Sequence, residues 1–496
     1  MTNAFSRSLM LAALMFSALI IGAPAHAVDA GQADAVAQLS GVSTAPRNVI
    51  LIIGDGMDEQ QITIARNYLA GAAGRLLMDQ LPLRAVAQVL TIEDKIEGKP
   101  LYVSDSANTA TSMATGIVTS RGRLGTTAGA DEPVATIAEL AIAAGYRAGI
   151  VSTASVTDAT PAAFAAHINF RLCENPQLME EVTYSDIYLG SCSQHMKRNG
   201  GAGSVAQQLA ESDLHVILGG GRKHFAPVAE GEPVSVLELA RSRGFQTVSS
   251  TAELAGSNSQ GRLLGLFADS TMPVRLRGEG GRSAEEPQPS LLNHVHRYLG
   301  DVTLPAIMDC EANPDFAGMP SLKQMTEAAL RHLAHDNPRG LFLMIESASI
   351  DKQAHERKPC GSIGEVAQLE EALASALAFA ATQPNTLVLV TADHSQAAQL
   401  IPFESLFAAY PIPVYTPGQL ARIRTPEGGH MAVNYATSNF MLEEHTGAAV
   451  PLYANSEGIG RVPPFITQPA LFTIMRDYLE LDVDQVRPSA PPALTD

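Results

Sequence analysis

Acidic and imidazole side chains stand at the ends of several apolar runs of this sequence, where a buried strand would end. Asp55 follows the run ILIIG, and Glu346 follows FLMI. Asp393 and His394 follow LVLVTA. In an open α/β sheet, ligands bind beyond the carboxyl ends of the strands. We therefore expect these side chains to converge at one edge of a sheet.

The residue types and their spacing favour zinc ions at that edge. Asp351 and His355 lie four residues apart, so a helix would place both on one face. With His445, in EEHTG, they offer one carboxylate and two imidazoles, which suit a zinc ion that keeps an open position. A second set built from the same residue types is Asp55, Asp393 and His394. Two zinc ions about 4 Å apart would clamp the attacking and leaving oxygens of an in-line phosphoryl displacement.

Residues 105–116, DSANTATSMATG, crowd small hydroxylated side chains behind an acid. Ser106 either caps a helix, which contributes about 1 kcal/mol to helix stability, or lies at a helix N-terminus whose backbone N–H groups face an anion. In the second case its hydroxyl is a candidate nucleophile. A DxxxH pair alone is usually a salt bridge, and ADH or GDG is often a turn. Only the joint occurrence of these motifs with Ser106 favours chemistry.

The elements that must position these residues alternate along the chain. Five apolar, β-branched runs have the composition of fully buried strands and cover residues 48–56, 145–153, 214–221, 340–347 and 386–394. Amphipathic segments such as EPVATIAELAIAAG lie between them. The alternation predicts an α/β fold with a doubly wound, mostly parallel central sheet flanked by helices on both faces. A polar stretch at about 278–290 and a loop-like region at about 396–430 interrupt it.

The first 27 residues have the features of a signal peptide. Arg7 precedes an apolar run, and Ala25, His26 and Ala27 give an A-x-A cleavage pattern. No later segment has about 18 apolar residues in succession, so we expect an exported, periplasmic chain without a membrane partner after cleavage. Residues 28–46 would form an N-terminal arm, 47–485 a single large domain with a variable insertion near 396–430, and 486–496 a flexible tail.

Charge and cysteine content narrow the class of partner and the compartment. The formal charge of −18 argues against nucleic acid, because binding to phosphate backbones relies on clustered Lys and Arg. An anionic substrate then needs local positive charge, such as a metal ion or a placed arginine. The four cysteines fit two disulfides in an oxidising compartment, with four free thiols as the alternative. Of three connectivities, sequence order favours Cys173 with Cys192 and Cys310 with Cys360.

Seven runs of the sequence, taken in order, resemble the alkaline phosphatases, closest to the bacterial periplasmic type. They are NVILIIGDGM, SDSANTATSMATG, TDATPAAFAAH, LLGLFADSTMPVR, ESASIDKQAH, TADH and EHTG. The similarity spans about residues 47–480. It implies hydrolysis of small-molecule phosphomonoesters through a phosphoserine, with two Zn²⁺ ions and one Mg²⁺ ion as cofactors, and a homodimer.

The resemblance also assigns roles to individual positions. Ser106 matches the nucleophile, and Arg171 matches the guanidinium that binds phosphate. The ligands of one zinc ion would be Asp351, His355 and His445, and those of the second would be Asp55, Asp393 and His394. Asp55 would also bridge to a magnesium ion, whose further ligands would be Thr160 and Glu346.

Three more residues would support these groups. Asp105 would orient Arg171, although an acid that merely begins a helix is the alternative. Asp158 and Lys352 match a variant of the family in which Asp and Lys lie beside the magnesium ion, where many relatives carry His. The oxygen-rich set without imidazole predicts magnesium rather than a third zinc ion.

Two other functions fit parts of the pattern. A sulfatase or phosphodiesterase of the same superfamily is one, but sulfatases need a C/S-x-P-x-R context, and Ser106 is followed by Ala107 and Asn108. A periplasmic phosphate-binding protein without turnover is the other. Such a protein has no need for a serine beside two zinc sites.

Overall fold

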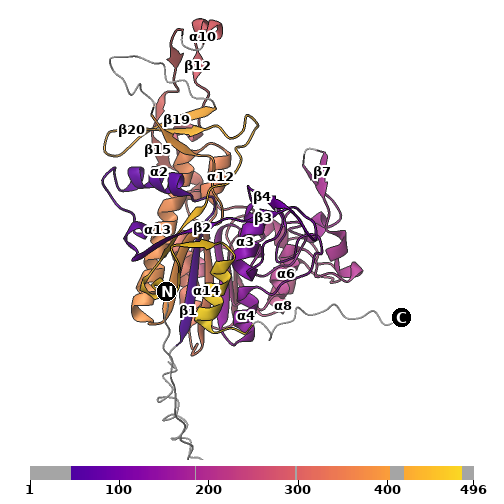
Figure 1. The fold of residues 1–496 in the computed structure, drawn as a ribbon. Coiled ribbons are helices and arrows are strands. Elements are labelled where there is room, and N and C mark those ends of the chain that lie inside the picture. Colours follow the sequence, from indigo (N-terminus) through magenta and orange to yellow (C-terminus); the bar gives the residue numbers. More distant parts are fainter. Residues whose placement is uncertain (1–45, 185, 297–298, 403–417, 483–496) are drawn as a thin grey trace, which may run out of the picture. The chain divides into compact units, whose positions relative to one another are not determined.

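The computed structural model describes residues 46–184, 186–296, 299–402 and 418–482 (Figure 1). The signal peptide predicted at 1–27, nearly all of the arm at 28–46 and the tail at 486–496 lie outside these residues, as does part of the insertion near 396–430. Within them, ten strands form one sheet, in the order β22 (Phe465–Thr467), β2 (Leu83–Gln88), β21 (Val450–Ala454), β17 (Thr386–Ala392), β1 (Arg47–Gly54), β16 (Gly340–Ser347), β5 (Arg147–Ser155), β8 (Val216–Gly220), β10 (Arg262–Leu266) and β9 (Phe245–Val248).

The sheet is mostly parallel, as predicted. Among its described strands, β21 alone runs against its neighbours, β17 and β2. The five strands predicted from apolar runs are β1, β5, β8, β16 and β17, and they lie together in its centre. Both faces of these strands are covered, which explains why they read as continuous apolar runs rather than as alternating patterns.

Helices cover the sheet in two sets, which confirms the predicted α/β class. One set includes α11 (Leu322–Ala334) and α13 (Pro359–Thr382), and the other includes α4 (Ile137–Ala143), α5 (Ala159–Ala162) and α14 (Ala470–Leu479). Both sets contact the central strands β5, β16 and β1. Figure 1 shows α14, in yellow, beside β1. The other α-helices of the described residues are α2 (Glu59–Leu69), α3 (Ser106–Thr115), α6 (Val205–Glu211), α7 (Arg222–Phe225), α8 (Val236–Ser242), α9 (Thr251–Ala255), α10 (Leu291–Val295) and α12 (Ser349–His355).

The prediction of a loop-like region at about 396–430 is wrong in part, because two strands lie within that range. A second sheet has the order β14 (Ile307–Met308), β19 (Gln419–Arg424), β20 (His430–Tyr435) and β18 (Gln399–Ile401), and β18 contacts α2. β19 and β20 form an antiparallel hairpin. β18 and β19 are the two strands within that region, and the turn residues Pro426, Glu427 and Gly428 contribute to its loop-like composition.

Two disulfides connect segments around the sheet. They join Cys173 to Cys192 and Cys310 to Cys360, the same pairs that sequence order favours. Short strand pairs complete the described structure: β3 (Thr91–Ile92) with β4 (Pro100–Leu101), β6 (Val182–Tyr184) with β7 (Ile187–Gly190), β11 (Leu276–Gly278) with β15 (Cys310–Ala312), and β12 (Gln288–Pro289) with β13 (Val302–Thr303). Across the described ranges, no helix combines the length and apolar character that crossing a membrane requires.

Candidate active site

The carboxyl ends of three neighbouring strands bring the predicted acidic residues together. β1 pairs in parallel with both β16 and β17, and in both registers Gly54 lies level with the last residue of the neighbour. Asp55 and Asp393 are the next residues after β1 and β17. Glu346 is the penultimate residue of β16. All three are buried, so the expected convergence at one edge of the sheet is present.

Asp351, His355 and His445 form the first cluster of candidate metal ligands. α12 places Asp351 and His355 on one face, with His355 Nε2 3.2 Å from Asp351 Oδ2. His445 Nε2 lies 3.4 Å from Asp351 Oδ1 and 3.0 Å from His355 Nε2. One carboxylate and two imidazole nitrogens therefore face one another, as a metal site requires.

A second cluster lies beside Ser106. His394 Nε2 is 3.4 Å from Asp55 Oδ1 and 3.3 Å from Asp393 Oδ2. Ser106 Oγ lies 3.1 Å from His394 Nε2 and 3.5 Å from Asp55 Oδ1. His394 connects the two clusters. Its candidate ligand atom lies within 4.8 Å of those of Asp351 and His445 from the first cluster, and also within 4.8 Å of those of Asp55 and Asp393.

Backbone carbonyl groups orient the imidazole rings. His355 Nδ1 makes a short hydrogen bond to the carbonyl oxygen of Glu443, and His445 Nδ1 lies 2.9 Å from that of Ser104. His394 Nδ1 lies 3.3 Å from the carbonyl oxygen of Ser395. A carbonyl oxygen only accepts, so in the neutral rings the Nδ1 atoms carry the hydrogens and the Nε2 lone pairs face the clusters. Second partners of this kind are typical of metal-binding histidines.

Burial and mutual repulsion act on the carboxylates of the site. Burial first, and then repulsion from other carboxylates with Asp393 foremost, holds the pKa of Asp55 well above its ordinary value. Burial also raises the pKa of Glu346, to about 8. Divalent cations would offset both effects by supplying the missing positive charge. The donor set therefore fits metal ions.

A third group of oxygen donors, candidates for a further cation, lies around Glu346. Its carboxylate accepts a short hydrogen bond from Ser152 Oγ, and the Thr160 hydroxyl is close enough to oppose the rise in its pKa. Among the described residues, the buried Thr160 Oγ1 nevertheless has no hydrogen bond of normal geometry. A buried hydroxyl without a regular partner beside carboxylates is a donor set that suits magnesium.

Lys352 and Asp158 form an ion pair beside this group. Lys352 Nζ donates to Asp158 Oδ2. Although burial opposes both changes, this contact raises the pKa of Lys352 and lowers the pKa of Asp158. Both side chains therefore remain charged across the physiological range.

Ser106 is the first residue of α3, and Asp105 is its N-cap. The Asp105 side chain accepts from Asn108 N at 3.1 Å, and in return Asp105 N donates to Asn108 Oδ1 at 2.9 Å. Ser106 is thus not the capping residue, and its side chain is left to face the clusters. Its place in the first turn gives it the positive end of the helix dipole.

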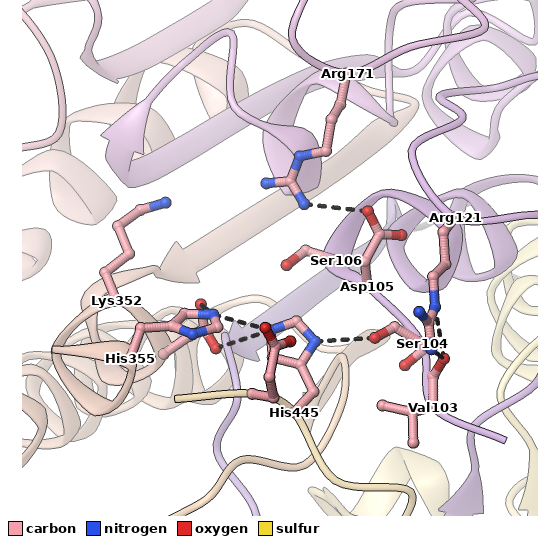
Figure 2. A pocket seen from close by; sticks show the side chains of 11 residues that line it. Val103, Ser104, Asp105, Ser106, Arg121, Arg171, Lys352, His355 and His445 are labelled. Atoms are coloured by element: carbon pink, nitrogen blue, oxygen red, sulfur yellow. Dashed lines mark hydrogen bonds and ion pairs between the residues drawn. The ribbon is translucent and has the colours of Figure 1, made fainter. Parts of the chain in front are cut away.

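A pocket opens between Ser106, Asp351, His355 and His445, and Arg171 also lines it. Arg171 Nη2 donates to Asp158 Oδ1 at 2.8 Å and its Nη1 to Asp105 Oδ2 at 3.4 Å. Asp105 therefore both caps α3 and contacts Arg171. Figure 2 shows Arg171 reaching toward Ser106 from one side and Lys352 from another. The pocket has a volume of about 300 Å³.

Sequence reasoning missed several polar residues that hold these groups. Gln396 Nε2 donates to Asp351 Oδ1 at 2.6 Å. Asp58, which caps α2, accepts from Ser395 Oγ at 2.6 Å and so fixes the residue after His394. Gln396 follows a strand end closely enough for the rule of converging strand ends to have found it. Asp58 carries no comparable signal.

The carboxyl ends of the central strands thus gather candidate metal ligands around a serine and an arginine. The alkaline phosphatase family profile matches residues 46–450. The chain is 39% identical to the alkaline phosphatase of Escherichia coli strain K12 over 444 residues, 88% of this chain and 86% of that protein. It is 38% identical to streptomycin-6-phosphate phosphatase of Streptomyces griseus over 461 residues, 91% of this chain and 93% of that one.

A solved structure shares the fold at lower identity. The alkaline phosphatase of Thermus thermophilus superposes with a TM-score of 0.60 at 19% identity, covering 92% of this chain and 96% of that chain. The chain belongs to the alkaline phosphatase family. The resemblance inferred from seven sequence runs is confirmed, as is the assignment to the phosphoric monoester hydrolases.

Proposed function

We propose that this chain hydrolyses phosphate monoesters through a phosphoserine at Ser106, in a site that binds two zinc ions and one magnesium ion. The observation that carries the proposal is the position of Ser106 Oγ, 3.1 Å from His394 Nε2 at the start of α3. A nucleophile there faces the pocket that Arg171 also lines.

The first displacement forms the phosphoserine. The Ser106 hydroxyl gives its proton to water, and Oγ attacks phosphorus in line. The bond from phosphorus to the ester oxygen breaks, and the leaving alkoxide takes a proton from water to become the alcohol. Arg171 binds two non-bridging oxygens with its planar fork, and Asp105 and Asp158 hold that fork in place. The N–H groups of the first turn of α3 face the negative charge.

The second displacement regenerates the serine. Water attacks the phosphorus of the phosphoserine, the bond to Ser106 Oγ breaks, and the hydroxyl regains a proton. Inorganic phosphate then leaves the Arg171 guanidinium. Two smaller barriers replace one large barrier.

The candidate ligand clusters support the metal assignment. Zinc ions would be held by Asp351, His355 and His445 and by Asp55, Asp393 and His394, and magnesium by Asp55, Thr160 and Glu346. When bound, such ions supply Lewis acidity that favours the ionised forms of a hydroxyl and of water. Lys352 and Asp158 would lie beside the magnesium ion.

One assay tests the covalent mechanism. Phosphate release from an aryl phosphate is measured with zinc and magnesium present, for the native chain and for Ser106→Ala, and an aryl sulfate is tested in parallel. We expect a loss of at least about 10³-fold in the variant and no comparable sulfate release. Equal rates for the two proteins would rule out a phosphoserine intermediate. Sulfate release faster than phosphate release would identify the chain as a sulfatase.

We also propose export to the periplasm and assembly as a homodimer. The signal-like features of residues 1–27 and the two disulfides support export, because disulfides form in oxidising compartments. The homodimer rests on family membership. Cell fractionation and light scattering of the purified protein test the two statements.

A further inference from the structure

A second polar network begins three residues after Arg171; its Asn175 and His224 are buried and its Glu174 is part-buried, and the proposed reaction does not use it. Its members are Glu174, Asn175 and His224, where His224 comes from α7. Asn175 Oδ1 accepts from Gln177 N at 2.9 Å, because Asn175 caps the short helix at Pro176–Leu178. Its Nδ2 group therefore faces His224 Nδ1, at 3.0 Å.

This arrangement fixes the tautomer of His224. The Asn175 amide donates to His224 Nδ1, so the hydrogen of the neutral ring resides on Nε2. His224 Nε2 lies 3.1 Å from Glu174 Oε2 and donates to it. Burial lowers the pKa of His224 to about 4, so the ring is neutral at working pH.

Glu174 also receives a hydrogen bond from the segment that carries Asp158. Thr157 Oγ1 donates to Glu174 Oε2 at 2.5 Å. Ser155 Oγ lies 2.7 Å from Thr157 Oγ1 and supplies a hydrogen to it in turn. Thr157 is fully buried, and the next residue, Asp158, holds Arg171.

Two segments are therefore linked twice. One runs from Arg171 to Glu174, and the other comprises Thr157 and Asp158. Arg171 joins Asp158 at the pocket, and Glu174 joins Thr157 behind it. Because the hydrogen bond from Thr157 to Glu174 restricts how the two segments move past each other, it also restricts where the guanidinium of Arg171 can lie.

We propose that Glu174 is a positioning residue for Arg171, and that His224 and Thr157 act with it. The inference rests on the proposed role of Arg171 in phosphate binding. Glu174 does not touch the pocket, so it acts through the placement of the guanidinium and not through substrate contact. Its loss should weaken the binding of phosphate groups more than it slows bond cleavage by Ser106.

The test is a double-mutant cycle with the metal-loaded full chain. Glu174→Ala and Thr157→Val remove the same hydrogen bond from its two ends, and Thr157→Val keeps the shape of the side chain. For each variant we expect KM for an aryl phosphate and the inhibition constant of inorganic phosphate to rise about 10-fold, with kcat changed less than about 3-fold. In an Arg171→Ala background, the same changes should have no further effect on either constant.

A matched control separates this effect from a general loss of a buried carboxylate. Glu370 on α13 also accepts two hydrogen bonds, from the backbone N–H groups of Leu77 and Met78, away from the pocket. Glu370→Ala, the same truncation, should leave both constants unchanged.

The outcomes distinguish the inference from the proposed function. Unchanged constants in Thr157→Val and Glu174→Ala overturn the positioning role, as do equal effects with and without Arg171. If Arg171→Ala itself leaves phosphate inhibition unchanged, the proposed phosphate site fails first, and the positioning role fails with it.

Discussion

His355 Nε2 and His445 Nε2 lie 3.0 Å apart, while the Nδ1 atom of each ring faces a backbone carbonyl oxygen. With hydrogens on both Nδ1 atoms, two neutral rings would point lone pairs at each other. A proton or a cation between them relieves that repulsion. Metal binding, protonation and stability are therefore linked at this pair.

Removing metal with a chelator will lower the temperature of unfolding. A ligand that binds only the folded state stabilises it by about 4 kcal/mol when its free concentration is a thousand times Kd. Thermal scans before and after chelation, and again after zinc is restored, measure the change. His355→Ala with His445→Ala should reduce the difference, and an identical unfolding temperature with and without chelator contradicts the prediction.

In the chelated protein, stability will fall as pH rises from 6.5 to about 9. Burial lowers the pKa of His445, but the hydrogen bond to Asp351 outweighs burial and raises this pKa from 6.5 to about 9. A group whose pKa is raised on folding adds stability that is fully present below pH 6.5 and is lost as pH passes 9. His445→Gln should flatten this part of the profile in thermal scans. Parallel profiles for the two proteins would rule out this source of the slope.

Arg171→Lys will lower kcat/KM by about 10²- to 10³-fold although it keeps the charge. Lysine lacks the planar fork that binds two oxygens and that Asp105 and Asp158 hold in place. Steady-state kinetics and phosphate inhibition measure the loss. Arg121→Lys is the control, because Arg121 is exposed at the pocket and donates to the carbonyl oxygen of Val103. A loss of only a few-fold in Arg171→Lys would show that charge alone suffices.

Crystals grown with zinc and magnesium will show two strong anomalous peaks at the zinc edge. The third position, among Thr160, Glu346 and Asp55, offers oxygen ligands, and the cation of Lys352 lies beside it. We expect no zinc signal there. Three strong peaks would contradict the assignment of magnesium.

Much of the fold and of the candidate site could be predicted because strand ends obey a simple geometric rule. Asp55, Glu346 and Asp393 are far apart in the chain, yet each stands at the carboxyl end of a central parallel strand. Buried parallel strands are also the easiest elements to recognise, since both of their faces are apolar. The short strands β18 and β19 lack that signal and were read as loop.

The residues that brace the site could not be predicted, because tertiary contacts define them. Ser152 matters through its place opposite Glu346 in the sheet register. Glu174 matters through Thr157 and His224, which lie 17 residues before it and 50 after it. Neither contact leaves a periodic pattern in the sequence.

The disulfide between Cys173 and Cys192 begins two residues after Arg171 and encloses the segment that Glu174 begins. A cross-link over a loop of this length lowers the entropy of the unfolded chain and so stabilises the folded state by about 3 kcal/mol. If the chain is exported as proposed, this bond forms only in the oxidising compartment, and we expect a copy that lacks it to hold phosphate esters less tightly. Phosphate inhibition of the reduced and of the oxidised chain, measured at equal metal loading, would give the size of that difference.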